Sequence, residues 1–406
     1  MVTQFDSPAQ GGPVRVHAVI DTLGSGGAEF LLADFAAVAA GSGIELSVAA
    51  LKPLEGQVPA ADRLRSQGIE PVAVPVTRTL GPLGLRRVRA HLAALRPDLV
   101  HTHLSTADFL GGLAAKSLGI PSVATIHADW WAADERSERL RIWLATQARR
   151  HLASTVIAVS ESARAEYLSA ARDSPEHVTV VRNGIADRAC AGCGAEVRRE
   201  LGLDSDDLMI TALSRLRPEK NFEVAIDAVT VLRERHPNVR LVIVGDGPHE
   251  DAVRRHAERS GIGVVLTGHR EDPMAVLDAT DVLLHPSRFD AFPTTVLEAM
   301  AASVPVVATA VGGILEIVQP GVTGVLVPVP PSAAAFADAL APLAADQSLR
   351  RRLGAAGRRR YEREFSARAW AGRVRAVYDH VLSRQRVPPL RPALPGSSSG
   401  SPRAGC

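Results

Sequence analysis

The sequence contains few cysteines. Only Cys190, Cys193 and Cys406 occur in 406 residues, which is too few to frame a disulfide scaffold, so we expect a reducing compartment. Cys190 and Cys193 have the spacing of half a zinc site, but no second pair of metal ligands follows at a suitable distance. We therefore interpret the pair as incidental and predict neither a metal ion nor a cofactor.

The sequence also lacks a long apolar run and a strong charge imbalance. No run reaches the ~18 apolar residues that a membrane span requires, and the first thirteen residues have neither the basic nor the apolar region of a signal peptide. We expect a cytoplasmic protein. Because the formal net charge is only +2, nothing attracts the whole chain to nucleic acid, and we expect no nucleic-acid partner.

The apolar content is sufficient for more than one core. Hydrophobic residues make up 46% of the chain and charged residues 22%, which is typical of a soluble globular protein. A chain of 406 residues exceeds the length at which one core usually keeps growing. We therefore expect two domains with a cleft between them.

Short apolar runs rich in β-branched residues alternate with amphipathic segments of helix length. This alternation is typical of βαβ units and a parallel sheet, and it occurs twice, so we predict an α/β fold with two doubly wound halves. The predicted strands are residues 14–20, 45–51, 70–76, 98–103, 121–127 and 155–160 in the first half and 208–214, 239–245, 263–268, 281–287, 304–310 and 323–328 in the second.

The composition also indicates the boundaries of these halves. Residues 187–205 contain glycines and no strand pattern, so we predict a linker there, between a first domain at residues 14–186 and a second at residues 206–365. After Pro330 the chain becomes helical and rich in arginine. Residues 386–406 form a tail rich in proline, glycine and serine that we predict to be disordered.

Open parallel sheets bind ligands beyond the carboxyl ends of their strands, and the loop after the first predicted strand contains Gly26 and Gly27. Glycines at the start of a helix let backbone N–H groups approach an anion. The loop does not match a dinucleotide-binding fingerprint, because Glu29 stands where that motif requires glycine. An ordinary tight turn is the alternative.

Basic residues follow the first predicted strand of the second half. Arg215 offers a planar fork and Lys220 a mobile point charge, a combination that suits a diphosphate, although a solvated charged loop is the alternative. Gly245 and Gly247 follow the next strand, and residues 267–270 follow the one after that. These turns would either line a nucleotide slot or serve only as turns.

Three histidines end two consecutive predicted strands. His101, His103 and His127 lack a carboxylate at ligand spacing, which disfavours a metal cluster. We favour His127 as a cleft residue that binds a sugar hydroxyl or a leaving oxygen, while His101 would also fit a core position satisfied by the backbone. The acidic run at residues 204–207 precedes a strand, at its amino end, and we interpret it as a turn.

Residues 287–300 (SRFDAFPTTVLEAM) place two acids on either side of a predicted helix start. Pro293 fits the first turn, and the next two threonines would present free N–H groups to a phosphate. Asp290 precedes the helix and Glu298 lies inside it. Carboxylates accept hydrogen bonds from vicinal hydroxyls, so both acids would hold a sugar or ribose. A glycosidase-like acid/base pair is the alternative.

These motifs together resemble the retaining glycosyltransferases of family 4 (glycosyl transferases group 1), which have the GT-B fold of two facing Rossmann-like domains. The resemblance covers nearly all of residues 14–385. The motifs that carry it are residues 26–29 (GGAE), His127, residues 214–221 (SRLRPEKN), 244–248 (VGDGP), 267–272 (TGHRED) and 287–316. It implies that the second domain binds the nucleotide sugar, that the first faces the acceptor, and that a helix at residues 366–385 crosses back onto the first.

The resemblance implies a role for each site residue. Arg215 and Lys220 would neutralise the donor diphosphate, and both would be catalytic together with His127 and Asp290. The remaining donor-binding residues would be Gly26 and Gly27 with Thr294 and Thr295 as phosphate-binding amides, Glu298 on the ribose, Arg270 near the base, and Gly247, Phe292 and Pro293 in the surrounding loops. His127 would contact the transferred sugar and Asp290 would hold its hydroxyls.

The implied function is metal-independent transfer of a sugar from a UDP- or GDP-sugar to a hydroxyl of a cell-surface glycan, a glycolipid intermediate or a natural product. The chain departs from the family pattern at Asp290 (usually Glu), Ala291 (usually Gly) and Ser303 (Gly), which leaves the donor sugar open. The alternatives are a nucleotide-sugar 2-epimerase, with Asp129 and Asp134 as candidate acids, and a sugar-nucleotide-binding protein without turnover.

A basic, partly apolar segment follows His127. It contains Trp130, Trp131, the run at residues 139–144 (RLRIWL), Arg149 and Arg150. Such a helix would rest on the inner face of an anionic membrane and admit a lipid-linked acceptor. The alternative is an ordinary amphipathic surface helix.

Overall fold

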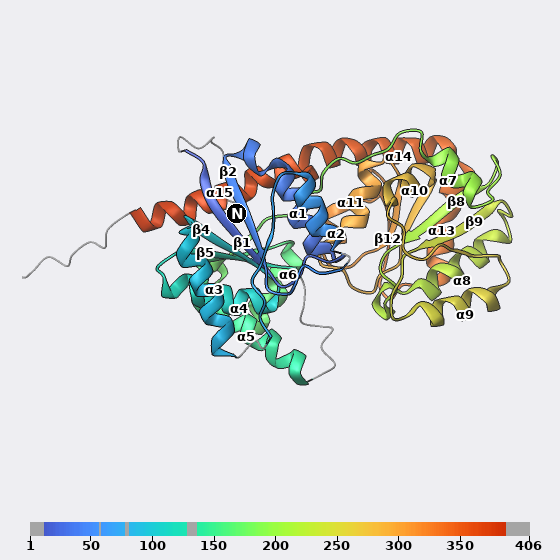
Figure 1. The fold of residues 1–406 in the computed structure, drawn as a ribbon. Helices are drawn as coiled ribbons and strands as arrows, with labels where there is room; N and C mark the ends of the chain where they lie inside the picture. Colours follow the sequence, from blue (N-terminus) through green and yellow to red (C-terminus); the bar gives the residue numbers. More distant parts are fainter. Residues whose placement is uncertain (1–11, 57, 78–80, 128–135, 387–406) are drawn as a thin grey trace, which may run out of the picture.

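The computed structural model describes residues 12–56, 58–77, 81–127 and 136–386. Within these ranges the chain forms two α/β domains, which appear as two lobes in Figure 1. The tail after residue 386, the candidate acids Asp129 and Asp134, and Trp130 with Trp131 lie outside the described residues.

The first domain contains a parallel sheet of seven strands in the order β3-β2-β1-β4-β5-β6-β7. Its elements are β1 (Val14–Ile20), α1 (Gly27–Ala39), β2 (Ile44–Ala50), α2 (Pro59–Ser66), β3 (Val72–Ala73), α3 (Pro82–Leu95), β4 (Leu99–His103), α4 (Ser105–Ser117), β5 (Ser122–Ile126), α5 (Arg136–Leu152), β6 (Thr155–Ala158), α6 (Glu161–Ala171) and β7 (Val178–Val180).

The second domain contains a parallel sheet of six strands in the order β10-β9-β8-β11-β12-β13. Its elements are α7 (Gly194–Glu200), β8 (Leu208–Leu213), α8 (Phe222–Arg233), β9 (Val239–Val244), α9 (Glu250–Ser260), β10 (Val265–Leu266), α10 (Pro273–Ala279), β11 (Val282–His285), α11 (Thr294–Ala301), β12 (Val306–Thr309), α12 (Ile314–Ile317), β13 (Gly324–Val327), α13 (Ala333–Ala345) and α14 (Gln347–Arg360), and α15 (Ala367–Arg386) follows.

The predicted fold class of two doubly wound parallel sheets is confirmed. Every predicted strand overlaps an observed one. The sequence analysis missed β7, because this strand has only three residues and pairs with β6 at the edge of the sheet. Strand order reverses between β1 and β4 and between β8 and β11, and ligands of such sheets bind where the order reverses.

The C-terminal helix returns to the first domain, as the predicted crossover requires. Figure 1 shows α14 beside the second lobe and α15 running on along the first. The Trp370 ring of α15 packs edge to face on Phe35 of α1, with 5.2 Å between the ring centroids. One cluster of buried apolar side chains therefore extends through both domains by way of α15 and the segment before it.

The segment that joins the two sheets is held by the start of this crossover. The Ile185 N–H donates to the Phe365 carbonyl at 3.0 Å, and the Ala367 N–H donates to the Ile185 carbonyl at 2.8 Å. A side chain on Gly184 would put its Cβ 2.6 Å from the Ser366 carbonyl oxygen and 2.6 Å from the Trp370 Cβ. Only glycine fits there, because the two chain segments approach too closely for a side chain.

The predicted linker contains more structure than its sequence indicated. The helix α7 lies within it, and the Gly194 N–H donates to the Asp278 carboxylate of α10 at 2.8 Å, so this part of the linker packs on the second domain. Cys190 and Cys193 are joined by a disulfide, which the sequence analysis did not predict.

Ser303 is strained by its backbone conformation. It follows α11 with φ of 61°, and the Ser303 and Val304 N–H groups donate to the carbonyls of Met300 and Ala299, which is the hydrogen-bond pattern of a Schellman motif. We expect Ser303→Gly to raise the free energy of unfolding by about 1 kcal/mol, because glycine adopts positive φ without steric cost. Urea unfolding measures the change. Ser303→Ala is the matched control, and an equal gain in both variants would contradict the explanation.

Candidate functional site

Four polar side chains meet where the strand order of the second sheet reverses. Lys220 follows β8, and its Nζ lies 2.6 Å from Oδ2 of Asp290, in the loop after β11. His285, the last residue of β11, places Nε2 3.1 Å from the same carboxylate oxygen and 3.1 Å from Oγ of Ser287. Lys220, His285 and Ser287 also line a small hollow of about 160 Å³, counting the part open to solvent.

The charge of Asp290 is set by two opposing effects. Burial by itself raises the pKa of this carboxyl, but the Lys220 ammonium and hydrogen bonds from His285 and Lys220 lower the pKa to about 2. Asp290 is therefore ionised at neutral pH. An ionised carboxylate accepts hydrogen bonds from hydroxyls and cannot serve as a general acid.

The loop that carries Arg215 is shaped by the glycine turn after β9. Gly247 has φ of 155°, and a Cβ at this position would collide with the Leu216 carbonyl oxygen. The Leu216 N–H in turn donates to the Asp246 carbonyl at 2.7 Å. Gly247 thus lets two loops pack closely, while the Arg215 side chain stays exposed at the carboxyl end of β8.

The residues at the start of α11 differ in how deeply they are buried. Pro293 is the N-cap residue, with φ of −68°, and Thr294 and Thr295 are the first two helical residues. Both threonines are half-buried. Phe292 is buried and packs edge to face on Phe365, so a donor contact from Phe292 would have to come from its backbone.

The charged groups around Glu298 differ from those around Asp290. Burial raises its pKa, Arg188 lowers it, Asp34 raises it and Arg63 lowers it. Asp34 of α1 itself accepts hydrogen bonds from the Arg188 guanidinium at 3.0 Å and the Ala186 N–H at 3.2 Å. The structure therefore places Glu298 against the first domain and the linker, and it does not join the two acids of residues 287–300 as a pair.

Arg270 is held by two carboxylates. Its Nη1 donates to Glu200 of α7 at 2.7 Å and its Nε to Asp272 at 2.7 Å, while Nη2 reaches both acids. Hydrogen bonds from Asp272 and Glu200 raise the pKa of the Arg270 guanidinium. In the structure Arg270 connects α7 to the loop after β10.

The glycine loop of the first domain begins α1 at the carboxyl end of β1. Gly26 is the N-cap residue and Gly27 the first helical residue. The Glu29 carboxylate lies against Gly26 and accepts a hydrogen bond from the Thr22 hydroxyl at 2.6 Å. An anion at this helix start would therefore have an acidic neighbour.

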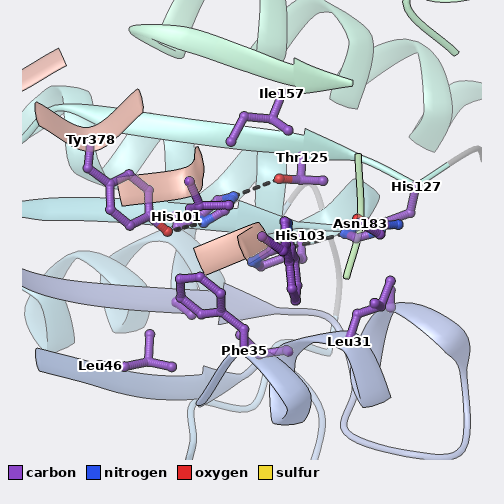
Figure 2. Close-up of a pocket in the computed structure, with 15 residues that line it drawn as sticks. Leu31, Phe35, Leu46, His101, His103, Thr125, His127, Ile157, Asn183 and Tyr378 are labelled. Atoms are coloured by element: carbon purple, nitrogen blue, oxygen red, sulfur yellow. Dashed lines mark hydrogen bonds between the residues drawn. The ribbon is translucent and has the colours of Figure 1, made fainter. Parts of the chain in front are cut away.

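The three predicted histidines form a continuous chain in the first domain. His103 Nδ1 lies 3.0 Å from His127 Nε2, and the ring centroids of His101 and His103 lie 4.2 Å apart. His101 contacts Tyr378 Oη at 2.6 Å and Thr125 Oγ1 at 2.7 Å. Figure 2 shows this chain, with His127 at one end and Tyr378 at the other. His101 is thus satisfied by side chains, not by the backbone.

The histidine chain lines a largely apolar cavity between the sheet, α1 and α15. Its space amounts to about 420 Å³, counting the part open to solvent, and its apolar lining includes Leu31, Phe35 and Ile157 (Figure 2). Among the described residues, no group of three or more His, Cys, Asp or Glu side chains has an arrangement that would hold a metal ion.

A buried ion pair acts on the charge state of His127. The Arg149 Nε donates to the Asp108 carboxylate at 2.6 Å, and the Arg149 side chain is only 1% exposed. Burial, together with the neighbouring His101 and Arg149, lowers the pKa of His127 to about 3, so this imidazole is neutral at pH 7. The prediction that Arg149 belongs to a membrane-facing surface is wrong, because its partner Asp108 draws it into the domain.

Two of these site residues escaped the sequence analysis. His285 is the last residue of β11 and lies near the end of the predicted strand at residues 281–287, so the attention to strand ends that selected His127 would also have found it. Tyr378 carries no such signal, because its contact with His101 joins residues 277 positions apart.

Two family models match the chain, glycosyltransferase family 4 over residues 25–188 and glycosyl transferases group 1 over residues 195–360. Among relatives, the D-inositol 3-phosphate glycosyltransferase of Actinosynnema mirum is 32% identical over 288 residues, 64% of this chain and 67% of that protein. The glycogen synthase of Mycobacterium tuberculosis is 28% identical over 74% of this chain and 72% of its own. Among solved structures, Anabaena HepE in complex with UDP-glucose has a TM-score of 0.78 at 22% identity and covers 90% of this chain and 100% of that chain.

The pKa of Asp290 predicts how this residue affects stability. Because its folded-state pKa of about 2 lies below the usual 3.8, ionised Asp290 stabilises the fold above pH 3.8, and this contribution is lost as the pH falls through 2. We expect Asp290→Asn to lower the free energy of unfolding by about 2 kcal/mol at pH 7 and by much less near pH 2.

Urea unfolding of the wild type and the variant across this pH range measures the difference. Asp338→Asn, on the exposed surface of α13, is the matched control and should change stability little at either pH. A loss in Asp290→Asn that stays constant from pH 7 to pH 2 would contradict the assigned role of Lys220.

Proposed function

Because the chain belongs to the glycosyltransferases of family 4, which have the GT-B fold, we propose that it transfers a sugar from a nucleotide-diphosphate donor to a hydroxyl group of an acceptor. The observation that carries this proposal is the cluster of Lys220, Asp290 and His285 at the point where the strand order of the second sheet reverses, with the exposed Arg215 on the same loop after β8 as Lys220. A cation pair next to an ionised carboxylate suits a diphosphate joined to a polyhydroxyl ring.

The proposed roles follow the positions of the side chains. Arg215 and Lys220 bind the diphosphate, and Asp290 accepts hydrogen bonds from the sugar hydroxyls. The remaining donor contacts are the amides of Gly26, Gly27, Thr294 and Thr295 on phosphate, Glu298 on the ribose, and the loops of Gly247, Arg270, Phe292 and Pro293 around the nucleotide. His127 of the first domain contacts the transferred sugar. The half-buried state of Glu298, at the boundary of both domains, supports a contact that forms when the donor enters between them.

We propose that transfer retains the configuration at the anomeric carbon. The bond from this carbon to the leaving phosphate oxygen breaks, the acceptor oxygen bonds to the same carbon from the same face, and the acceptor proton passes to the leaving phosphate. The products are the glycosylated acceptor and a nucleotide diphosphate. The positive charges of Arg215 and Lys220 and the helix starts offset the charge on the leaving group, so the proposed reaction requires no metal ion.

A UDP-sugar is the donor class that we favour. HepE, whose fold this chain shares, was solved in complex with UDP-glucose. The names of the relatives in turn indicate hydroxyl-bearing acceptors of more than one kind, a phosphorylated inositol and a glucan. We therefore propose an acceptor that presents a free hydroxyl, such as a glycan, a glycolipid intermediate or a natural product.

A screen for release of nucleotide diphosphate from UDP-, GDP- and dTDP-sugars tests the function. We expect release with a UDP- or GDP-sugar, loss of release in Asp290→Ala, and a fall in kcat of about 100-fold in Lys220→Ala and Arg215→Ala. Arg217→Ala is the matched control, because Arg217 lies on the same loop and its guanidinium is 3.9 Å from Glu219.

The same screen separates the alternatives. Binding of a sugar nucleotide without release from any donor would indicate a binding protein, and conversion of the donor sugar itself would indicate an epimerase. We expect Asp290→Glu to change the order of preferred donors, since the longer side chain moves the carboxylate by about one carbon–carbon bond. An unchanged order would show that Asp290 carries no specificity.

We also propose a peripheral membrane contact through α5. None of the helices in the described ranges combines the length and apolar composition that a bilayer crossing requires. On α5, however, Leu140 is 47% exposed between the exposed Arg139 and Arg141, and Trp143 is 55% exposed. Exposed apolar side chains flanked by arginines suit the surface of an anionic bilayer.

Co-sedimentation with vesicles of anionic phospholipid tests this contact. We expect the wild type to sediment with the vesicles and the double variant Leu140→Glu/Trp143→Glu to remain largely in solution, because two charges would enter the apolar layer. Leu315→Glu is the matched control, since Leu315 of α12 is 56% exposed in the second domain. Equal sedimentation of the double variant and the wild type would refute the contact.

A further inference from the structure

The chain of histidines connects the crossover helix to the residue proposed to touch the sugar. Tyr378 of α15 contacts His101, the His101 ring packs against the tilted ring of His103, and His103 contacts His127. Both nitrogens of His101 are occupied, by the Tyr378 and Thr125 hydroxyls, so its ring is held in place. His103 therefore has a fixed neighbour on one side and His127 on the other (Figure 2).

The contact between His103 and His127 allows two arrangements of protons when both rings are neutral. In the first, His103 Nδ1–H donates to His127 Nε2, which leaves the His127 proton on Nδ1. In the second, His127 Nε2–H donates to His103 Nδ1, which leaves the His103 proton on Nε2. A neutral imidazole has one donor and one acceptor nitrogen, so the two arrangements exclude each other.

His103 Nε2 distinguishes the two arrangements. The His103 residue is 5% exposed, and its Nε2 is buried without a hydrogen-bond partner in the part of the chain that the structure describes. The second arrangement would leave an N–H there with nothing to accept it, whereas the first leaves only a lone pair. Orphaned buried N–H groups are rarer than under-used acceptors in native proteins, which favours the first arrangement.

We propose that His103 is a positioning residue, which donates from Nδ1 to His127 and thereby places the His127 proton on Nδ1, the nitrogen that faces away from His103. This inference rests on the proposed function, in which His127 meets the transferred sugar. His127 then donates a hydrogen bond to a sugar or leaving oxygen and has no lone pair on Nδ1 to accept the proton of the acceptor. In that arrangement the proton of the acceptor hydroxyl passes to the leaving phosphate.

The burial of His101, His103 and His127 favours the neutral form of all three imidazoles. Burial lowers the pKa values of His101 and His103 well below the usual value, and burial with the neighbouring His101 and Arg149 lowers the pKa of His127 to about 3. The positive charge of Arg149, which Asp108 holds in the domain interior, therefore opposes a second proton on His127.

The position of the His127 proton can be measured directly. In protein labelled with ¹⁵N-histidine, long-range ¹H–¹⁵N correlation spectra distinguish a protonated from an unprotonated ring nitrogen, and comparison with His127→Gln assigns the signals. At pH 7 we expect His127 to carry its proton on Nδ1. A proton on Nε2 would overturn the proposal, and the measurement needs no substrate.

Variants of His103 test its part in this arrangement. His103→Leu removes the donor, so we expect the His127 proton to leave Nδ1 in part and kcat to fall about tenfold with little change in KM. His103→Asn keeps an N–H donor near the position of Nδ1 and should restore both the spectrum and kcat. A His127 spectrum that is unchanged in His103→Leu would also overturn the proposal.

A matched control is available on the other side of the same sheet. His91 of α3 places Nε2 3.1 Å from Nε2 of the buried His17. His91→Leu removes this second histidine pair and should leave the His127 spectrum and kcat unchanged. A shift of the His127 signals in the His91→Leu variant would count against a specific role of His103. If the wild type releases no nucleotide from any donor while His127 keeps its proton on Nδ1, the proposed function fails and the assigned tautomer stands.

Discussion

The close crossing of two chain segments between the domains determines how the rest of the molecule is arranged. Gly184 and Ile185 pass the segment at residues 365–367 at hydrogen-bonding distance, with no room for a side chain on Gly184. Glu316 of α12 accepts hydrogen bonds from the Glu161 N–H and from Arg182, both at 2.7 Å. The segments beyond the carboxyl ends of β6, β7 and β12 therefore meet, so the edges of the two sheets where ligands of such folds bind lie on the same side of the domain contact.

The candidate sites of the two domains differ in electrostatic character. The second domain contains two cations, Lys220 and Arg215, and an ionised carboxylate, Asp290, a combination that would suit the charged and polyhydroxylated donor proposed above. The first domain contains neutral imidazoles that are held by neighbouring side chains, and His127 is the one proposed to meet the sugar. A reaction in which charge develops on a leaving phosphate gains most from fixed charges on that side only, because a protonated histidine near the sugar would oppose positive charge at the anomeric carbon.

The sequence predicts local structure here better than it predicts the neighbours of each side chain. The other strands could be predicted from runs rich in β-branched residues. The sequence analysis missed β7 because three residues are too few to show an alternating pattern. Lys220 and Asp290 were found because both lie at carboxyl ends of strands, where convergence follows from topology. Asp34, Arg63 and Arg188 around Glu298 could not be found, since they depend on how the two domains meet. The sequence analysis placed Arg149 on the surface because helix periodicity indicates only which side chains share a face. The buried Asp108 that binds Arg149 lies on a separate helix, α4.

Under the proposed function, the aspartate at position 290 would link sugar binding to phosphate binding. Lys220 Nζ lies 2.6 Å from Oδ2 of Asp290, and His285 Nε2 lies 3.1 Å from the same oxygen, so under the proposed function Oδ1 would be the oxygen that accepts from a sugar hydroxyl. An ammonium has three N–H donors, and one bond to Asp290 leaves two for a phosphate. A carboxylate with one more methylene would move its oxygens relative to β11 and carry the Lys220 ammonium with them. Under the proposed function, Lys220 would therefore help to position both the donor sugar and the diphosphate, and a substitution at 290 would affect both.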